Sequence, residues 1–184
     1  MLFRSWGGVY ALTGMGGTHV VLRAVNAPDI YRLLRDEKVT FACMAPAVLR
    51  TLLDFPERDA YTLAVKPRIT VAGAPPPAAF IERLETEMGW EFMQIYGLTE
   101  TSPLLTVNRA PAEWDALDAA ERSRRLSRAG VPAVGVRIRV DENGEILAKS
   151  NHVFAGYWNQ PEETAKALDG GWFHTGDEIG RAHV

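Results

Sequence analysis

Cysteine is almost absent from this sequence, since Cys43 is the single thiol among 184 residues. One cysteine excludes a disulfide framework within the chain and fits a reducing compartment. Long apolar runs are missing as well: none approaches the roughly 20 residues that span a bilayer, and the first residues lack the apolar stretch of a signal peptide. We therefore expect a cytoplasmic protein with no transmembrane segment, and peripheral contact with a membrane stays open as an alternative.

A surplus of positive charge is also lacking. The chain has 20 Lys and Arg against 23 Asp and Glu, which gives a net charge of -3, and it has no basic cluster. A nucleic-acid partner is therefore not expected. His19, His152 and His174 lack the spacing of metal ligands. The balance of 47% hydrophobic and 23% charged residues is typical of a globular protein with a sizeable core.

The two ends read as material foreign to the fold. Residues 1–5 (MLFRS) and 179–184 (IGRAHV) match translations of a sequencing-library adapter in its two orientations, so we interpret both as adapter-derived scars. Genuine termini are the alternative, and genomic DNA that continued past both ends would reject the adapter interpretation. If the scars are real, the natural protein is longer in both directions.

Residues 6–110 alternate between helical and extended patterns. We expect helices at 6–17, 28–38, 46–53 and 78–88 and strands at 18–23, 39–43, 68–72 and 90–95. The first of these helices is apolar and glycine-rich, which predicts a buried position. The repeated order of strand and helix predicts an α/β fold with a mostly parallel sheet.

The character of the chain changes after residue 110. Residues 111–133 form a predicted helical excursion and linker, in which the charged segment 114–128 is expected to be exposed. Residues 134–178 are predicted to be a smaller β-rich subdomain. Its first two strands, 134–140 and 145–149, are joined by Asp141–Gly144, where Asn-Gly is a typical hairpin turn.

Polar and small residues follow two of the predicted strands, where ligands of open α/β sheets bind. Gly73 and Ala74 follow the strand 68–72 and would let a flat ligand approach the backbone. Tyr96 can stack on a base, Thr99 can bond a phosphate oxygen, and Glu100 can hold Mg²⁺. The residues alone leave a second interpretation equally open: a turn tyrosine, a helix cap at Thr99 and a solvated glutamate.

A third cluster lies near the end of the chain, at residues 172–177 (WFHTGD). Asp177 can accept hydrogen bonds from two ribose hydroxyls. An ordinary Asx-turn aspartate is equally compatible with the spacing.

Three segments together carry a family resemblance: VAGAPPP (71–77), YGLTETSP (96–103) and GYWNQPEETAKAL…GWFHTGD (156–177). In this order they resemble the adenylate-forming (AMP-binding) superfamily. Within it the chain is most similar to medium- and long-chain fatty acyl-CoA ligases, because of the insertion before residue 130 and of WGGVYALTGMGGTHVVLR (6–23). The resemblance implies part of a large N-terminal α/β domain followed by a β-rich subdomain that ends at the TGD motif.

The resemblance also implies roles for particular residues. Gly73 and Ala74 would border adenine, Tyr96 would stack on it, Gly97 would belong to the same nucleotide loop, Thr99 would contact the α-phosphate, Glu100 would ligate Mg²⁺, Asp177 would hold the ribose, and Trp6, Met93 and Gln94 would line the acyl pocket. The implied ligands are ATP, Mg²⁺ and CoA as co-substrate. A homodimer of the full-length enzyme is compatible with the resemblance.

The activity implied is an ATP-dependent ligation. A fatty carboxylate is activated as acyl-adenylate and transferred to CoA, which releases pyrophosphate and AMP. The lysine-bearing phosphate loop and the small C-terminal domain of that family do not appear in the sequence, so we expect this chain alone not to turn over. An enzyme activating aryl or amino acids, a non-catalytic nucleotide-binding module and a purely structural α/β domain are the alternatives.

Overall fold

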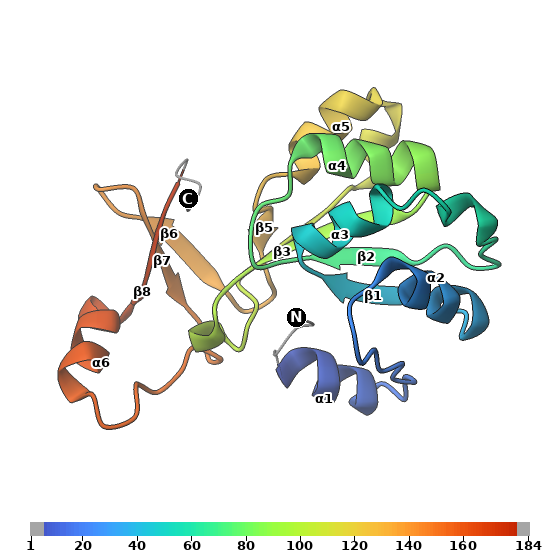
Figure 1. Cartoon of the computed structure of the whole chain (residues 1–184). Helices are drawn as coiled ribbons and strands as arrows, with labels where there is room; N and C mark the ends of the chain where they lie inside the picture. The colour runs from blue at the N-terminus through green and yellow to red at the C-terminus, as the bar shows by residue number, and fades with distance from the viewer. Residues whose placement is uncertain (1–5, 180–184) are drawn as a thin grey trace.

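The structure is a computed structural model that describes residues 6–179, and it contains two β-sheets (Figure 1). The larger has the strand order β1 (Phe41–Met44), β2 (Arg68–Val71), β3 (Glu91–Tyr96), β4 (Thr106–Arg109) and β5 (Val131–Pro132). The smaller consists of β6 (Arg137–Val140), β7 (Glu145–Lys149) and β8 (Phe173–Glu178). The α/β class predicted from the sequence is confirmed.

The larger sheet is mixed: the strands predicted from the sequence, β1 to β3, pair parallel as expected, and two further strands extend the sheet antiparallel. β1, β2 and β3 are parallel, whereas β3 with β4 and β4 with β5 pair antiparallel. The parallel pairs are joined through helices, α3 (Pro46–Leu53) and α4 (Ala78–Arg83). β3 and β4 are joined only by the loop 97–105, which is too short for the crossover that a parallel pair needs. The chain therefore reverses directly after β3.

Local signals in the sequence account for the helices that pack on the larger sheet. Asn26 caps α2 (Ala27–Asp36) by accepting a 2.9 Å hydrogen bond from the amide of Asp29. α3 has the predicted bounds, and proline occupies its first turn. α4 continues into a π-helical turn, Leu84–Met88, and ends at Gly89 with φ of 62°. In Figure 1, α3, α4 and α5 lie on one side of the larger sheet and α1 lies on the other.

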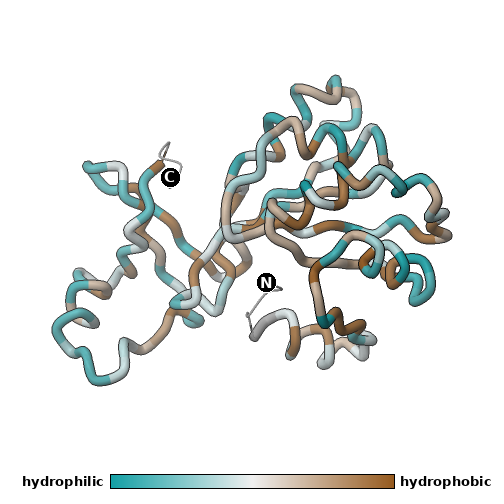
Figure 2. The backbone as a smooth tube through the Cα atoms, in the orientation of Figure 1, coloured by the Kyte–Doolittle hydropathy of each residue, from teal (hydrophilic) through white to brown (hydrophobic). Residues whose placement is uncertain are grey.

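The main core joins this sheet to α2, α3 and α4. Tyr31 is buried at its centre and stacks on Phe55 and Tyr61, with ring centroids 5.7 and 5.3 Å apart, and Trp90 lies 6.1 Å away. The Tyr31 hydroxyl donates to the carbonyl of Leu52 at 3.0 Å, so its polar end is satisfied. In Figure 2 the brown, hydrophobic stretches of the backbone run through the strands of this sheet.

The N-terminal part differs from the prediction. α1 spans Trp6–Gly14, but it is not buried: Val9 is 57% exposed and Tyr10 63%. Residues 18–23 form no strand, and Val21 is 79% exposed although the segment is hydrophobic (Figure 2). A β-branched segment becomes a strand only when a neighbouring strand takes its hydrogen bonds, and no described strand pairs with this one.

The excursion after β4 is helical, but it is not simply exposed. It contains a 3₁₀ turn, Ala112–Ala116, and α5 (Ala119–Leu126), and Leu126 is fully buried in the main core. Two amides from adjacent strands hold the end of α5. Asn108 donates to the carbonyls of Arg125 and Arg128 at 2.8 Å, and the Gln94 amide, oriented to satisfy its hydrogen bonds, donates to Leu126 and Ser127 at 3.1 and 3.2 Å.

The smaller sheet is antiparallel throughout. The predicted hairpin is confirmed, and its turn is fixed by Asp141, which accepts hydrogen bonds from the amides of Asn143 and Glu145 at 2.9 and 2.8 Å. α6 (Pro161–Ala167) lies between β7 and β8 in the chain. A second core of Leu105, Val136, Ala148 and Phe173 covers one face, and Tyr96 and Leu98 pack against it from the loop after β3.

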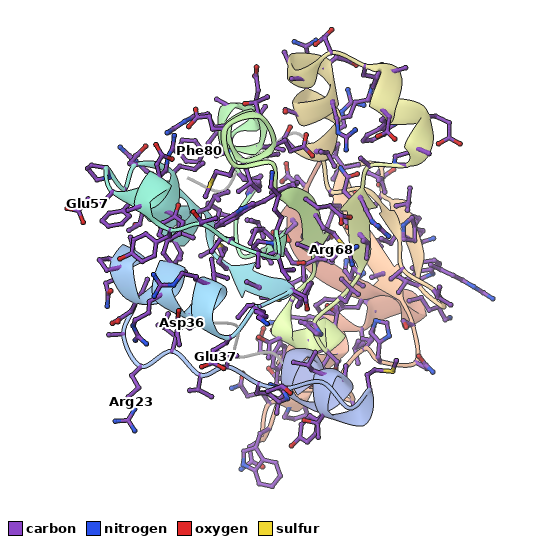
Figure 3. The ribbon with its side chains drawn as sticks, turned by 90° about the vertical axis from the view of Figure 1, so that its right-hand side faces the viewer. Arg23, Asp36, Glu37, Glu57, Arg68 and Phe80 are labelled. Atoms are coloured by element: carbon purple, nitrogen blue, oxygen red, sulfur yellow. The ribbon has the colours of Figure 1, made fainter. Side chains whose placement is uncertain are left out.

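Ion pairs link neighbouring strands of the larger sheet. Figure 3 shows Arg68 toward the middle of the molecule, whereas Arg23 and Glu57 point outward. Arg68 lies 2.8 Å from Glu91, which also accepts a 2.7 Å bond from Arg109, so three neighbouring strands are linked.

Among residues 6–179 no helix has the length and apolar character required to cross a bilayer.

Candidate nucleotide site

The candidate site lies where the larger sheet meets the smaller one. β2 and β3 are parallel and in register from Arg68 opposite Glu91 to Val71 opposite Gln94, so both strands end at the same edge. Gly73 and Ala74 follow β2, and both are exposed. Tyr96 is the last residue of β3 and is half-buried. The two loops predicted to border a nucleotide therefore leave the sheet side by side.

Tyr96 and Asp177 are in direct contact. The Tyr96 hydroxyl donates a hydrogen bond to Oδ2 of Asp177 at 2.7 Å, across a separation of 81 residues. Burial, followed by this hydrogen bond, raises the pKa of Tyr96 above its ordinary value, so the phenol stays protonated and remains a donor. Tyr96 is therefore not a turn tyrosine, and the carboxylate of Asp177 does not serve an isolated Asx turn.

The strand that carries Asp177 is held by Glu145 from the neighbouring strand. One oxygen of Glu145 accepts from the amide of Gly176 at 2.9 Å, and the other lies 3.0 Å from Nδ1 of His174. Gly176 has φ of 72°, which favours glycine, and the pairing of β7 with β8 is irregular at Glu145. This irregularity sets the direction of the TGD segment. His174 therefore contributes to the site through its contact with Glu145, which holds the strand that carries Asp177.

Glu100 is half-buried, and two hydrogen bonds from the loop 154–157 hold it in place. Its backbone carbonyl accepts from the amide of Phe154 at 2.7 Å, and its Oε1 accepts from the hydroxyl of Tyr157 at 3.0 Å. Burial and then the hydrogen bond to Glu100 raise the pKa of Tyr157. Glu100 is therefore not a freely solvated glutamate, and the smaller sheet's half of the chain fixes its position.

The hydroxyl of Thr99 does not cap the local helical turn, although the sequence also allowed that role. Thr99 begins a 3₁₀ turn, Thr99–Thr101, and is exposed. The capping hydroxyl belongs to buried Thr101, whose Oγ1 lies 2.9 Å from both the amide and the carbonyl of Leu98. Thr99 is thus available to a ligand, while Thr101 holds the turn in shape.

Glycine is required at positions 97 and 73 of the site for two different physical reasons. A Cβ at Gly97 would overlap the carbonyl oxygen of Pro103 and lie 2.9 Å from the amide of Leu105, so the residue is needed for close backbone packing. Gly73 has open space around it but φ of 90°, a conformation that other residues rarely adopt. Gly97 therefore shapes the loop, and Gly73 leaves room beside it.

The predicted acyl-pocket residues do not share one surface. Met93 and Gln94 are consecutive in β3, so their side chains point to opposite faces of the sheet. Gln94 is buried under α5, whereas Met93 is half-buried on the other face. Gln94 therefore cannot line a pocket together with Met93. The side chain of Trp6 lies outside the described part of the structure.

The donor set fits a weakly held magnesium ion. Glu100 presents one carboxylate oxygen, Oε2, that has no hydrogen bond or ion pair among residues 6–179. The same part of the chain contains no group of three or more His, Cys, Asp or Glu that could hold a metal. Mg²⁺ is commonly bound through one or two carboxylates together with substrate phosphates and water. Glu100 with the exposed Thr99 hydroxyl suits that mode.

Comparison with known proteins identifies the family. The family described as AMP-binding enzyme matches residues 4–158. The chain belongs to the AMP-binding enzyme family. The match includes Tyr96, Glu100 and Tyr157, and Asp177 lies beyond it.

Curated relatives extend the likeness over nearly the whole chain. It is 40% identical to probable acyl-activating enzyme 9 of Arabidopsis thaliana, over 97% of this chain and 34% of that protein. It is 35% identical to 4-hydroxybutyrate–CoA ligase 2 of Metallosphaera sedula, over 94% of this chain and 34% of that protein. The chain thus spans about a third of the length of these relatives.

A solved structure supports the fold of this family member. The N-terminal domain of FACL13 from Mycobacterium tuberculosis superposes with a TM-score of 0.78 at 27% identity, covering 92% of this chain and 43% of that one. The α/β fold is therefore that of the N-terminal domain of adenylate-forming enzymes.

Several residues of the site were not singled out by sequence reasoning. Tyr157, Phe154, Glu145 and Thr101 act on predicted site residues through contacts that depend on the tertiary fold. Tyr157 lies in the GYW segment that contributed to the family resemblance, and that placement was the only available signal. The spacing within the chain could not reveal its partner, which is 57 residues away.

Proposed function

We propose that the protein containing this chain is an ATP-dependent acyl-CoA ligase, in which the loop 96–100 and Asp177 form one wall of the adenylate site. The observation that carries the proposal is the 2.7 Å hydrogen bond between Tyr96 and Asp177, which brings the predicted base-stacking and ribose-binding residues together. The similarity to acyl-activating and CoA-ligase relatives supports the same reaction class.

In the proposed reaction, a carboxylate oxygen attacks the α-phosphorus of ATP and pyrophosphate leaves. The sulfur of CoA then attacks the acyl carbon and AMP leaves. Tyr96 offers a flat face to adenine, Asp177 accepts from the ribose hydroxyls, and Thr99 donates to an α-phosphate oxygen. The first step joins two anions, so positioning and charge neutralisation contribute more than acid–base groups. Mg²⁺ bound by Glu100 would neutralise phosphate charge.

The substrate we propose is a fatty, that is aliphatic, carboxylate. Met93 supports this choice, because it presents an apolar, half-buried side chain on the sheet face opposite α5, three residues before Tyr96 in β3. One relative is a ligase of 4-hydroxybutyrate, an aliphatic acid. Gln94 is left out of the proposed pocket because it is buried beneath α5.

A chimera tests this function. Residues 6–178 would replace the aligned segment of acyl-activating enzyme 9, and carboxylate-dependent exchange of pyrophosphate into ATP would be measured with aliphatic, aryl and amino acids. We expect exchange with aliphatic acids, and we expect the Glu100→Gln chimera to lose most of it. Exchange only with aryl or amino acids would reject the substrate class, and a folded chimera that binds ATP without exchange would reject adenylation.

We expect the 184-residue chain alone to form no thioester, because it spans only about a third of the length of the acyl-activating and CoA-ligase relatives that it matches. An ATP- and CoA-dependent thioester made by the purified chain would contradict this.

A further inference from the structure

Glu100 is the predicted metal ligand, and its environment contains a residue whose role no motif assigns. Tyr157 comes from the segment between the smaller sheet and α6, and its hydroxyl lies 3.0 Å from Oε1 of Glu100. A tyrosine hydroxyl that donates to a carboxylate occupies one of its two oxygens and leaves the other to face a ligand.

Tyr157 is itself held on two sides. Its amide donates to Oγ1 of Thr164 in α6 at 2.9 Å, which fixes the backbone. Its ring meets Phe154 edge-on with centroids 4.7 Å apart, and Phe154 in turn packs on Phe173 of the second core at 5.6 Å. The hydroxyl is therefore presented to Glu100 by a fixed ring rather than by a freely rotating one.

The backbone before Tyr157 is equally constrained. Gly156 has φ of 151°, and a Cβ there would lie 2.9 Å from Oγ1 of Thr164. The glycine thus lets the loop approach α6 closely enough for Thr164 to hold Tyr157. Phe154, in the same loop, donates its amide to the carbonyl of Glu100 at 2.7 Å. The loop 154–157 therefore fixes both the main chain and the carboxylate of residue 100.

We propose that Tyr157 is a positioning residue that orients the carboxylate of Glu100, so that Oε2 is directed to a divalent cation bound with the nucleotide. The proposal rests on the function proposed above, in which Glu100 ligates the metal. Residues that hydrogen-bond a metal-ligating carboxylate set its direction, and their loss lowers metal affinity by about 10- to 100-fold in typical sites. Because Glu100 is only half-buried, we expect the lower end of that range, about tenfold.

The test uses the 184-residue chain and a paramagnetic probe. Free Mn²⁺ would be quantified by electron paramagnetic resonance in the presence of AMP, which chelates Mn²⁺ far more weakly than ATP, for wild type, Tyr157→Phe, Glu100→Gln and Tyr61→Phe, with AMP and no protein as the blank. Tyr61→Phe is the matched control, because it removes a hydroxyl for which the described residues provide no hydrogen bond. AMP affinity would be measured by calorimetry without metal, and circular dichroism would verify folding.

We expect Glu100→Gln to weaken Mn²⁺ binding more than Tyr157→Phe, Tyr157→Phe to weaken it about tenfold, and AMP affinity to stay within twofold in both. If Glu100→Gln weakens Mn²⁺ binding and Tyr157→Phe does not, the positioning role is rejected while the proposed function survives. Equal losses of AMP and Mn²⁺ affinity in Tyr157→Phe would indicate that Tyr157 is merely structural, and would also reject the positioning role. If wild type binds no Mn²⁺ beyond the blank with AMP, or Glu100→Gln has no effect, both proposals fall.

Discussion

The Tyr96 hydroxyl donates a 2.7 Å hydrogen bond to Oδ2 of Asp177, and this contact joins the end of β3 in the larger sheet to β8 in the smaller one. Both residues are half-buried. A hydrogen bond to a charged acceptor that is partly removed from water contributes more than a neutral surface one. The relation between the two sheets thus depends in part on the two residues to which the proposal assigns adenine and ribose.

Replacing Tyr96 with phenylalanine removes this contact and keeps the ring. We expect the free energy of unfolding in urea to fall by about 1 kcal/mol, because Asp177 loses a charge-assisted partner in a half-buried place. Tyr61→Phe is the matched control and should change stability by a few tenths of a kcal/mol at most. Equal stability of the Tyr96→Phe variant and wild type would show that the contact does not hold the sheets together.

Two glycine substitutions should differ in severity. Gly97→Ala places a Cβ against the carbonyl of Pro103 and should destabilise the chain by about 3 kcal/mol or more, as overpacking against backbone does. Gly73→Ala meets open space and should cost about 1–2 kcal/mol, the strain of its φ of 90°. Gly8→Ala, in α1 with nothing near it, should be neutral or stabilising. Thermal unfolding of the three variants measures the order, and any other order contradicts this account.

The end of α5 depends on Asn108. Its amide satisfies the carbonyls of Arg125 and Arg128, and Asn108→Ala would leave them without that donor, at a cost of about 2 kcal/mol. Amide hydrogen exchange in residues 119–126 should become faster in the variant. Asn151→Ala, at an exposed position, serves as the control. Unchanged exchange in α5 would mean that burial of Leu126 alone holds the helix.

Much of the α/β half could be predicted from the sequence because its signals are local. Apolar spacing and proline at the first turn located α3, and Asn-Gly located the hairpin between β6 and β7. The antiparallel pairing of β4 with β3 could not be predicted, because it depends on the short loop after Tyr96. The strand expected at 18–23 failed because strand formation depends on a partner that no local pattern reveals.

The site was predictable in its residues but not in its contacts. Tyr96, Glu100 and Asp177 were chosen by residue type and by resemblance, and the structure links each of them to the smaller sheet's half of the chain. Tyr157 and Glu145 could not be chosen that way, since each acts through a partner that is distant in sequence. Gln94 shows the opposite failure: a position in a motif-bearing strand did not specify which face its side chain takes.

Cys43 should be a poorly reactive thiol. Burial raises its pKa to about 11 from an ordinary 9.0, so at pH 8 only about one thiol in a thousand is ionised. We expect reaction with a disulfide reagent at pH 8 to be on the order of 100 times slower than that of free cysteine, and to become fast in urea. Fast labelling of the folded chain would contradict the raised pKa of this half-buried thiol.

The same pKa predicts a loss of stability in alkali. Because the folded value lies above the unfolded one, the contribution of Cys43 is fully present below pH 9 and is lost as the pH rises through about 11. Urea unfolding at several pH values should therefore show a steeper decline in wild type than in Cys43→Ala over this window. Parallel curves for the two proteins would contradict the prediction.

Calorimetric titration of the chain with AMP tests the central claim most directly, because AMP probes the wall formed by Tyr96 and Asp177 without metal or phosphate loop. Wild type should bind, and Tyr96→Ala and Asp177→Ala should each bind about tenfold more weakly, a loss of about 1.4 kcal/mol. Arg139→Ala is the control and should match wild type, because it removes a guanidinium that lies over the ring of Trp172 and contributes no predicted site residue. Absence of AMP binding by the folded wild type, or an affinity unaffected by Asp177→Ala, would contradict the assignment of this wall to a nucleotide.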